Sequence, residues 1–162
     1  MKIPKKLKNL KIKLLILDVD GVLTDGKLYF SDNGIEIKSF NIKDGLGLKL
    51  LLRHGIEVAV ISGRKSIATK NRMHELGIKH VYLGIDDKIK TFDHLKKKLL
   101  LKNKNIACMG DDLPDTPLMQ KVGFSIAVKD AVPKVRALAD YITKATGGNG
   151  AVRETCELLL HD

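Results

Sequence analysis

The chain has 162 residues, of which 44% are hydrophobic and 4% aromatic, and its formal net charge at pH 7 is +10. This length predicts one domain, residues 1–162, with an aliphatic core because aromatic side chains are few and Trp is absent. The positive charge suggests a nucleic-acid ligand, but the lysines are spread along the chain and too few aromatic side chains are present for base stacking, so a solvated lysine-rich surface is favoured.

The first predicted element is a buried strand at residues 14–18 that ends in an acidic motif. Its apolar run, Leu14 to Leu17, is typical of a central strand in a parallel sheet, and Asp18 and Asp20 follow it. Such strands carry functional residues at their carboxyl ends. Two carboxylates in one cleft cost free energy unless a cation or a shared proton compensates them, so the motif predicts a divalent metal ion.

A β-hairpin is predicted next, over about residues 27–40. Two segments, 27–30 and 35–40, flank the turn Ser31-Asp32-Asn33-Gly34, and Asn-Gly is a strong hairpin signal. Because this segment follows the first strand directly, we expect the hairpin to project beside the mouth of the site.

The rest of the chain alternates between short apolar strands and segments of helical periodicity. The clearest helix is 88–101, in which Ile89, Phe92, Leu95 and Leu99 share one face. This alternation predicts an α/β fold, a Rossmann-like doubly wound parallel sheet with right-handed crossovers. The other predicted strands are 57–61, 80–83, 106–109, 124–128 and 140–142, and the other predicted helices are about 45–54, 65–76, 115–121, 132–138 and 151–160.

Polar side chains follow four of the predicted strands. Because the carboxyl ends of parallel strands meet at one edge of a sheet, we expect these side chains to share one crevice. Carboxylates, a hydroxyl, a lysine and an arginine are the groups that phosphoryl transfer requires. The residues are Asp18 and Asp20 after the first strand, Ser62 and Arg64 after the second, Lys88 after the third, and Asp111, Asp112 and Asp115 after the fourth.

Each of these residues also has an ordinary structural interpretation. Ser62 could cap the next helix, and Lys88 could be a solvated surface lysine. Asp112 and Asp115 could complement a helix dipole. Their occurrence at successive strand ends favours the functional interpretation, and neither a P-loop nor a dinucleotide-binding glycine motif is present.

The order of these motifs resembles that of the haloacid dehalogenase superfamily of phosphatases. Within it, the chain resembles the capless family of 3-deoxy-D-manno-octulosonate 8-phosphate phosphatases from about Leu14 to Leu160. The superfamily resemblance rests on Asp18-Val19-Asp20-Gly21-Val22-Leu23-Thr24, Ser62-Gly63-Arg64, Lys88 and Gly110-Asp111-Asp112-Leu113-Pro114-Asp115. The closer one adds Asp25-Gly26, the hairpin, Phe40-Asn41-Ile42-Lys43-Asp44-Gly45, Gly77-Ile78, Phe92, Gly147-Gly148 and Gly150-Ala151-Val152-Arg153-Glu154.

The resemblance implies Mg²⁺-dependent hydrolysis of the sugar 8-phosphate through an aspartyl-phosphate intermediate, in lipopolysaccharide biosynthesis. By this pattern Asp18 attacks phosphorus, while Asp20 protonates the leaving hydroxyl and later takes a proton from water. Ser62 and Lys88 are expected to hold the phosphate oxygens. Mg²⁺ is expected on Asp18, the backbone carbonyl of Asp20 and Asp111, and Asp112 and Asp115 are expected to orient Lys88 or the metal's water ligands.

The family also implies a set of substrate-binding residues. Lys49 departs from the arginine common in the family, which keeps the charge but removes two-point recognition of a carboxylate. The expected substrate contacts are Asp20, Asn41, Ile42, Lys43, Asp44, Gly45, Lys49, Arg64, Arg72 and Lys88.

A missing cap domain implies that the site is closed in another way. In the family the hairpins of a homotetramer help to build a barrel, and a neighbouring subunit covers the site. The apolar residues Phe30, Ile35, Ile37 and Phe40 are expected to supply contacts for that assembly, although the hairpin could instead pack on its own domain.

Two alternatives remain from the sequence. One keeps the chemistry and changes the substrate to the 9-phosphate of a nine-carbon, sialic-acid-type sugar. The other is a non-catalytic binding module associated with nucleic acid. Cys108 and Cys156, without metal-site spacing, and the lack of a signal-peptide or membrane-span pattern lead us to expect a soluble cytoplasmic protein with no membrane partner.

Overall fold

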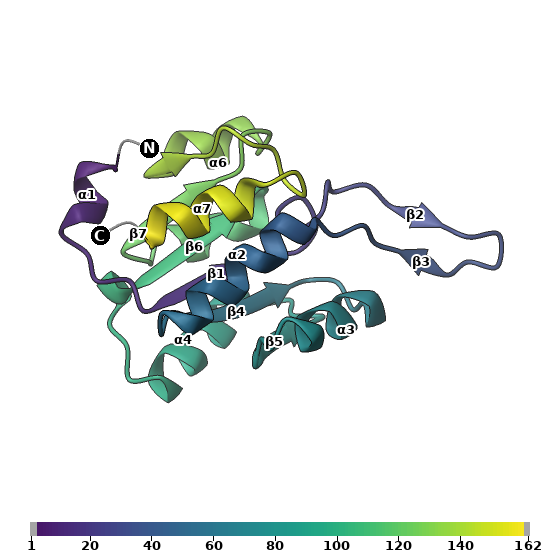
Figure 1. The fold of residues 1–162 in the computed structure, drawn as a ribbon, viewed down its shortest axis with the longest axis horizontal. Helices are drawn as coiled ribbons and strands as arrows, with labels where there is room; N and C mark the ends of the chain where they lie inside the picture. The colour runs from purple at the N-terminus through teal and green to yellow at the C-terminus, as the bar shows by residue number, and fades with distance from the viewer. Residues whose placement is uncertain (1–2, 161–162) are drawn as a thin grey trace.

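Six short segments form a parallel β-sheet in the computed structural model, which describes residues 3–160 (Figure 1). The strand order is β5-β4-β1-β6-β7-β8, and each pairing between neighbours is parallel. The predicted parallel α/β sheet is therefore confirmed. The strands are β1 (Leu14–Leu17), β4 (Glu57–Ser62), β5 (His80–Leu83), β6 (Ile106–Gly110), β7 (Phe124–Ala127) and β8 (Tyr141–Ile142).

Strand β1 lies at the centre of the sheet, which explains why its sequence is a continuous apolar run. All four of its residues are buried, because helices flank the sheet. Leu17 pairs with Val60 of β4 on one side and with Met109 of β6 on the other. The chain segments that follow β1, β4 and β6 consequently leave the sheet at the same edge.

The helices arise from amphipathic segments between these strands. Helices α2 and α7 lie side by side across one face of the sheet (Figure 1), and α4 buries Phe92 and Leu95. None of the helices between residues 3 and 160 combines the length and apolar character needed to cross a membrane. The helices are α1 (Lys5–Lys8), α2 (Ile42–Arg53), α3 (Ile67–Glu75), α4 (Lys88–Lys98), α5 (Thr116–Met119), α6 (Pro133–Leu138) and α7 (Ala151–Leu159).

Several helix boundaries differ from the prediction for local reasons. Helix α2 begins at Ile42, not near residue 45, because the Asn41 side chain accepts a hydrogen bond from the Lys43 amide (2.8 Å) and caps the helix. Helix α4 ends at Lys98 because Leu100 adopts a left-handed conformation with φ of 53°. Helix α1 and the short 3₁₀ helices were not predicted; the latter lie at Asn103–Asn105 and Leu113–Asp115.

The predicted hairpin is present and projects from the sheet (Figure 1). Its antiparallel ladder, β2 (Tyr29–Phe30) with β3 (Glu36–Ile37), is shorter than the segments 27–30 and 35–40 suggested. Phe30, Ile35 and Ile37 are more than half exposed, whereas Phe40 packs against the core. The hairpin tip therefore presents apolar side chains that this subunit does not cover.

Candidate active site

A cavity of about 760 Å³ lies at the edge where β1, β4 and β6 end and α4 begins. Its wall is formed by polar residues from strand ends together with a few apolar ones, among them Ile85 and Pro117. The sequence-predicted residues that line it are Asp18, Asp20, Ser62, Arg64, Lys88, Asp111, Asp112 and Asp115. The structure thus brings together the side chains that follow four different strands.

Lys88 lies between two carboxylates at the floor of this cavity. Its Nζ atom is 2.7 Å from Oδ1 of Asp18 and 2.7 Å from Oδ1 of Asp115. Only 10% of the Lys88 side chain is exposed, so its interpretation as a solvated surface lysine is wrong. Asp115 and Asp18 raise the pKa of Lys88 above its usual range despite burial, so Lys88 is a cation here.

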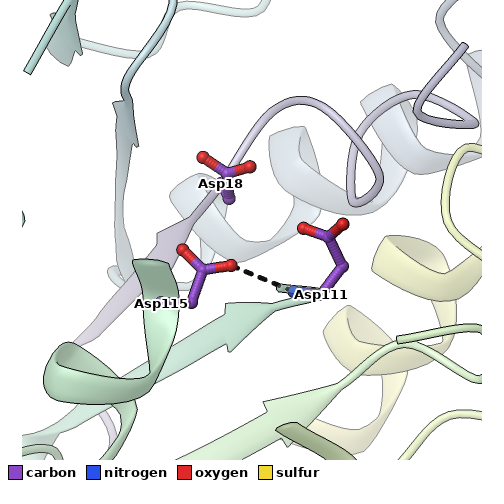
Figure 2. A group of neighbouring side chains, drawn as sticks. All are labelled: Asp18, Asp111 and Asp115. Atoms are coloured by element: carbon purple, nitrogen blue, oxygen red, sulfur yellow. Dashed lines mark hydrogen bonds between the residues drawn. The ribbon is translucent and has the colours of Figure 1, made fainter. Parts of the chain in front are cut away.

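Asp115 is positioned by the backbone that follows β6. Its Oδ2 accepts a hydrogen bond from the amide of Asp111 (3.0 Å; Figure 2). The Asp112 carboxylate accepts one from the Leu113 amide (2.7 Å), and together the two aspartates form a capping box around the 3₁₀ helix. Asp112 and Asp115 therefore have a capping role, which differs from the helix-dipole role considered from the sequence, and Asp115 contacts Lys88 in addition.

Ser62 is buried at the carboxyl end of β4 and does not cap a helix. Ser66 caps α3 instead, by accepting a hydrogen bond from the Thr69 amide (3.3 Å). The Ser62 hydroxyl accepts a long hydrogen bond from the Arg64 amide (3.4 Å). Its hydroxyl hydrogen therefore stays available for another acceptor in the cavity.

Asp111 faces Asp18 across the same cavity (Figure 2). The close approach of the two loops depends on Gly21, because a Cβ atom there would collide with the Asp111 carboxylate and φ at this residue is +87°. The Asp111 carboxylate accepts no side-chain or backbone hydrogen bond from residues 3–160.

The carboxylates of Asp18, Asp111 and Asp115 carry more negative charge than Lys88 alone can neutralise. Burial and the neighbouring carboxylates of Asp115 and Asp18 raise the pKa of Asp111 to about 8. Burial likewise raises the pKa of Asp18 to about 6, even though Lys88 favours its ionised form. One ammonium group therefore does not neutralise three neighbouring carboxylates.

A divalent metal ion fits this arrangement. Asp18, Asp111 and Asp115 each offer an oxygen, and these oxygens lie within 4.8 Å of one another (Figure 2). Both oxygens of Asp115 already accept hydrogen bonds, which leaves Asp18 and Asp111 as the side chains best able to bind the ion directly. Carboxylate oxygens are ligands that Mg²⁺ prefers.

The remaining predicted contact residues lie outside this cavity within one subunit. Asp44 is buried, and its carboxylate accepts hydrogen bonds from the amides of Gly150 (3.3 Å) and Arg153 (2.7 Å) at the start of α7. Arg72 passes close to Gly45 and pairs with Glu75 (2.8 Å). The predicted residues absent from the cavity lining are Asn41, Ile42, Lys43, Asp44, Gly45, Lys49 and Arg72.

Two hairpin residues reach the site, and the sequence reasoning did not select them. Lys38 forms an ion pair with Asp20, and Glu36 forms one with Arg64. The alternation of side chains along the strand could have identified these two residues. Glu36 and Lys38 alternate with the exposed Ile35 and Ile37, so their side chains share the opposite face of the ribbon.

The loop that carries Asp20 is supported from behind by the glycine-rich segment 147–150. The amide of Gly148 donates a hydrogen bond to the carbonyl of Val22 (2.9 Å). Gly147 lies so close to Gly21 that a Cβ atom would overlap the Gly21 carbonyl oxygen. The position of the acidic motif therefore depends on a segment more than a hundred residues away in the chain.

This chain resembles known proteins in both sequence and fold. A family profile described as haloacid dehalogenase-like hydrolase matches residues 84–154. The chain is 52% identical over 149 residues to the 3-deoxy-D-manno-octulosonate 8-phosphate phosphatase of Escherichia coli K12, covering 92% of this chain and 79% of that protein.

Solved structures agree with the sequence relatives. The phosphatase of that name from Moraxella catarrhalis, crystallised with a magnesium ion, a phosphate ion and the sugar acid, superposes with a TM-score of 0.94 at 45% identity, covering 98% of this chain and 92% of that one. The enzyme from Yersinia pestis gives a TM-score of 0.93 at 42% identity, covering 98% of this chain and 84% of that one.

Proposed function

Because this chain belongs to the 3-deoxy-D-manno-octulosonate 8-phosphate phosphatase family of haloacid dehalogenase-like hydrolases, we propose that it releases phosphate from that sugar-acid ester in a Mg²⁺-dependent reaction of lipopolysaccharide biosynthesis. The chain is thus a phosphoric monoester hydrolase. The observation that best supports the chemistry is the contact of Lys88 with Asp18 and Asp115, beside Asp111.

We assign Asp18 the role of the nucleophile. One of its oxygens is held by Lys88, which leaves the other to attack phosphorus and form an aspartyl phosphate. The ammonium group of Lys88 and the hydroxyl of Ser62 can donate hydrogen bonds to the phosphate oxygens. Asp115 keeps Lys88 in place through its 2.7 Å contact.

We assign Asp20 the role of the general acid and base. It lies two residues after Asp18 and lines the same cavity. We assign it the protonation of the sugar hydroxyl as the P–O bond breaks, and then the removal of a proton from the water that hydrolyses the aspartyl phosphate. The two carboxylates therefore divide attack and proton transfer between them.

Asp18, Asp111 and the backbone carbonyl of Asp20 are the proposed Mg²⁺ ligands. Bound there, the ion would neutralise charge on the phosphoryl group and on the clustered carboxylates. Burial and the neighbouring carboxylates raise the pKa of Asp111, and this supports the assignment because a bound cation would favour the ionised form of that group.

The assembly that we propose is a homotetramer in which hairpins meet. The exposed side chains of Phe30, Ile35 and Ile37 support contact with another copy, since a two-stranded ribbon is only marginally stable alone. Contact between subunits could also bring Lys49, Arg72 and the segment 41–45 to a neighbour's cavity. The oligomer remains a prediction, which the mass in solution tests.

The substrate is tested with a panel of sugar-acid phosphates, assayed for phosphate release with Mg²⁺ and with EDTA. We expect the highest kcat/KM for 3-deoxy-D-manno-octulosonate 8-phosphate and loss of activity in EDTA. A higher kcat/KM for the 9-phosphate of a nine-carbon sugar acid would instead assign that substrate. No Mg²⁺-stimulated release from any ester, together with salt-sensitive DNA binding, would favour the non-catalytic alternative.

Gly147→Ala tests the support behind the acidic motif. The new methyl group would overlap the Gly21 carbonyl oxygen, and backbone atoms cannot move aside cheaply. We expect a loss of about 1–3 kcal/mol in the free energy of unfolding and roughly a 100-fold loss in kcat, because Asp20 is displaced.

Gly55→Ala is the matched control for this variant. Gly55 has φ of +76°, but a Cβ atom added there would meet no other atom within 4 Å, so that variant introduces backbone strain without a collision. It is expected to lose some stability and to keep wild-type kcat. Urea unfolding and steady-state assays give both quantities, and unchanged kcat in Gly147→Ala would contradict the supporting role.

A further inference from the structure

The side chain of Lys38 is almost completely buried although it lies on a projecting hairpin. Only 3% of it is exposed. Its Nζ atom contacts Oδ1 of Asp20 and lies 3.4 Å from Oε1 of Glu36. A lysine is rarely buried without a reason, and here both of its partners are carboxylates.

Asp20, Lys38, Glu36 and Arg64 form a closed group of two anions and two cations. Glu36 contacts Arg64 as well as Lys38, and Nε of Arg64 lies 3.8 Å from Oδ2 of Asp20. Glu36 and Lys38 belong to the hairpin, whereas Asp20 and Arg64 follow strands of the sheet. The group therefore ties the hairpin to two sides of the cavity.

The two oxygens of Asp20 have different surroundings. Oδ1 is the acceptor for Lys38. Oδ2 is buried and accepts no hydrogen bond from residues 3–160, and Asp20 lines the cavity. Arg64 at 3.8 Å is too far to donate a hydrogen bond to Oδ2. A buried oxygen without a hydrogen bond costs free energy, so its presence points to a ligand atom that completes it.

We propose that Lys38 is a positioning residue that holds one oxygen of Asp20 and thereby leaves the other oriented for proton exchange with the sugar hydroxyl. This inference rests on the phosphatase function proposed above. Before this step Asp20 takes up a proton from solvent on the oxygen that Lys38 does not contact. As the P–O bond breaks, that proton passes to the leaving oxygen, and the resulting carboxylate keeps its contact with Lys38. Lys38 itself neither gains nor loses a proton.

A direct role for Lys38 in binding phosphate is less compatible with its contacts. Its side chain is buried and is not part of the cavity lining, whereas Lys88 and Ser62 both line the cavity and can face a phosphate oxygen. Arg64, with 46% of its side chain exposed, is the better candidate within this group to contact substrate.

Lys38→Met tests the proposal through the leaving group. A sugar hydroxyl needs a proton as it departs, whereas p-nitrophenolate departs without one, and kcat/KM covers only the steps through departure. We expect kcat/KM to fall about tenfold or more for the sugar phosphate, against a general-acid contribution of roughly 10²–10⁴. The loss for p-nitrophenyl phosphate should be less than about threefold. Equal losses for the two esters would overturn the proposal.

A double-mutant cycle of Lys38→Met and Asp20→Asn is a second test, and it requires kcat/KM only for the sugar phosphate. If Lys38 acts through Asp20, then adding Lys38→Met to Asp20→Asn should change kcat/KM by less than about twofold. A further loss as large as that of Lys38→Met alone would overturn the proposal, because it would place Lys38 in contact with substrate or in the fold.

Two controls separate this role from stability and from charge. Lys27→Met removes an exposed lysine of the same hairpin segment, whose nearest carboxylate is Asp25 at 3.6 Å, and should leave both kcat/KM values unchanged. Lys38→Arg keeps the cation and should recover most of the sugar-phosphate activity, and Lys38→Gln replaces Lys38→Met if that variant fails to fold. Wild-type protein inactive on both esters would contradict the proposed function, not the role of Lys38.

Discussion

Replacing Asp18 with asparagine is expected to lower kcat by about 10⁴-fold or more, because an amide cannot attack phosphorus and no other carboxylate can take its place. Asp20 is bound to Lys38, Asp115 is enclosed by Lys88 and backbone amides, and Asp111 lies across the cavity. The covalent intermediate is the second readout: hydroxylamine should trap an acyl phosphate in wild-type protein and none in Asp18→Asn.

Asp93→Asn is the matched control for this experiment. Asp93 lies on α4, where its carboxylate is 3.4 Å from Lys96 and 3.8 Å from Lys121 at the surface. Such exposed pairs contribute little to stability, so this variant should keep wild-type kcat. An Asp18→Asn protein that retains more than a tenth of wild-type kcat would show that the reaction does not pass through Asp18.

Replacing Lys88 with methionine should affect both activity and stability. The ammonium group that faces the phosphate oxygens is lost, and removal of one such donor typically costs about 10²–10³ in kcat. The same change leaves the carboxylates of Asp18 and Asp115 without their shared cation. Breaking a buried ion pair from one side costs about 3–5 kcal/mol, and partial exposure here places the expected loss near the lower end.

Steady-state assays and urea unfolding measure these two effects separately. Lys90→Met provides the control, because Lys90 is exposed on the same helix and forms no ion pair with residues 3–160. It should change neither quantity. A Lys88→Met protein with kcat within about threefold of wild type would contradict the assignment of Lys88 to the phosphate.

The sequence predicted the sheet and the cluster at its edge because both follow from local patterns and one topological rule. Leu14 to Leu17 is apolar throughout, as a strand buried on both faces must be, and Asp18 is the next residue. Strand ends in a parallel sheet share an edge, so Lys88 could be placed near Asp18 without any knowledge of distances.

The contacts of Lys38 could not be predicted in the same way. A hairpin's pattern fixes which side chains share a face, but the angle between the ribbon and the sheet depends on tertiary packing. Asp44 shows the same limit, since its buried carboxylate serves α7, an element that begins more than a hundred residues later. Only the family resemblance predicts that the segment 41–45 contacts substrate, and within one subunit this segment lies outside the cavity lining.

The central place of β1 also bears on how the protein folds as it is synthesised. Leu14 precedes both of its pairing partners in the chain, Glu57 on one side and Ile106 on the other. Both edges of this apolar strand are therefore paired only after β4 and β6 have been synthesised. Pairing between strands so far apart in the sequence is slow. Because Asp18 follows β1 directly, the site is completed only when the sheet is complete. A nascent chain that does not yet include β6 therefore exposes an apolar segment that chaperones would recognise.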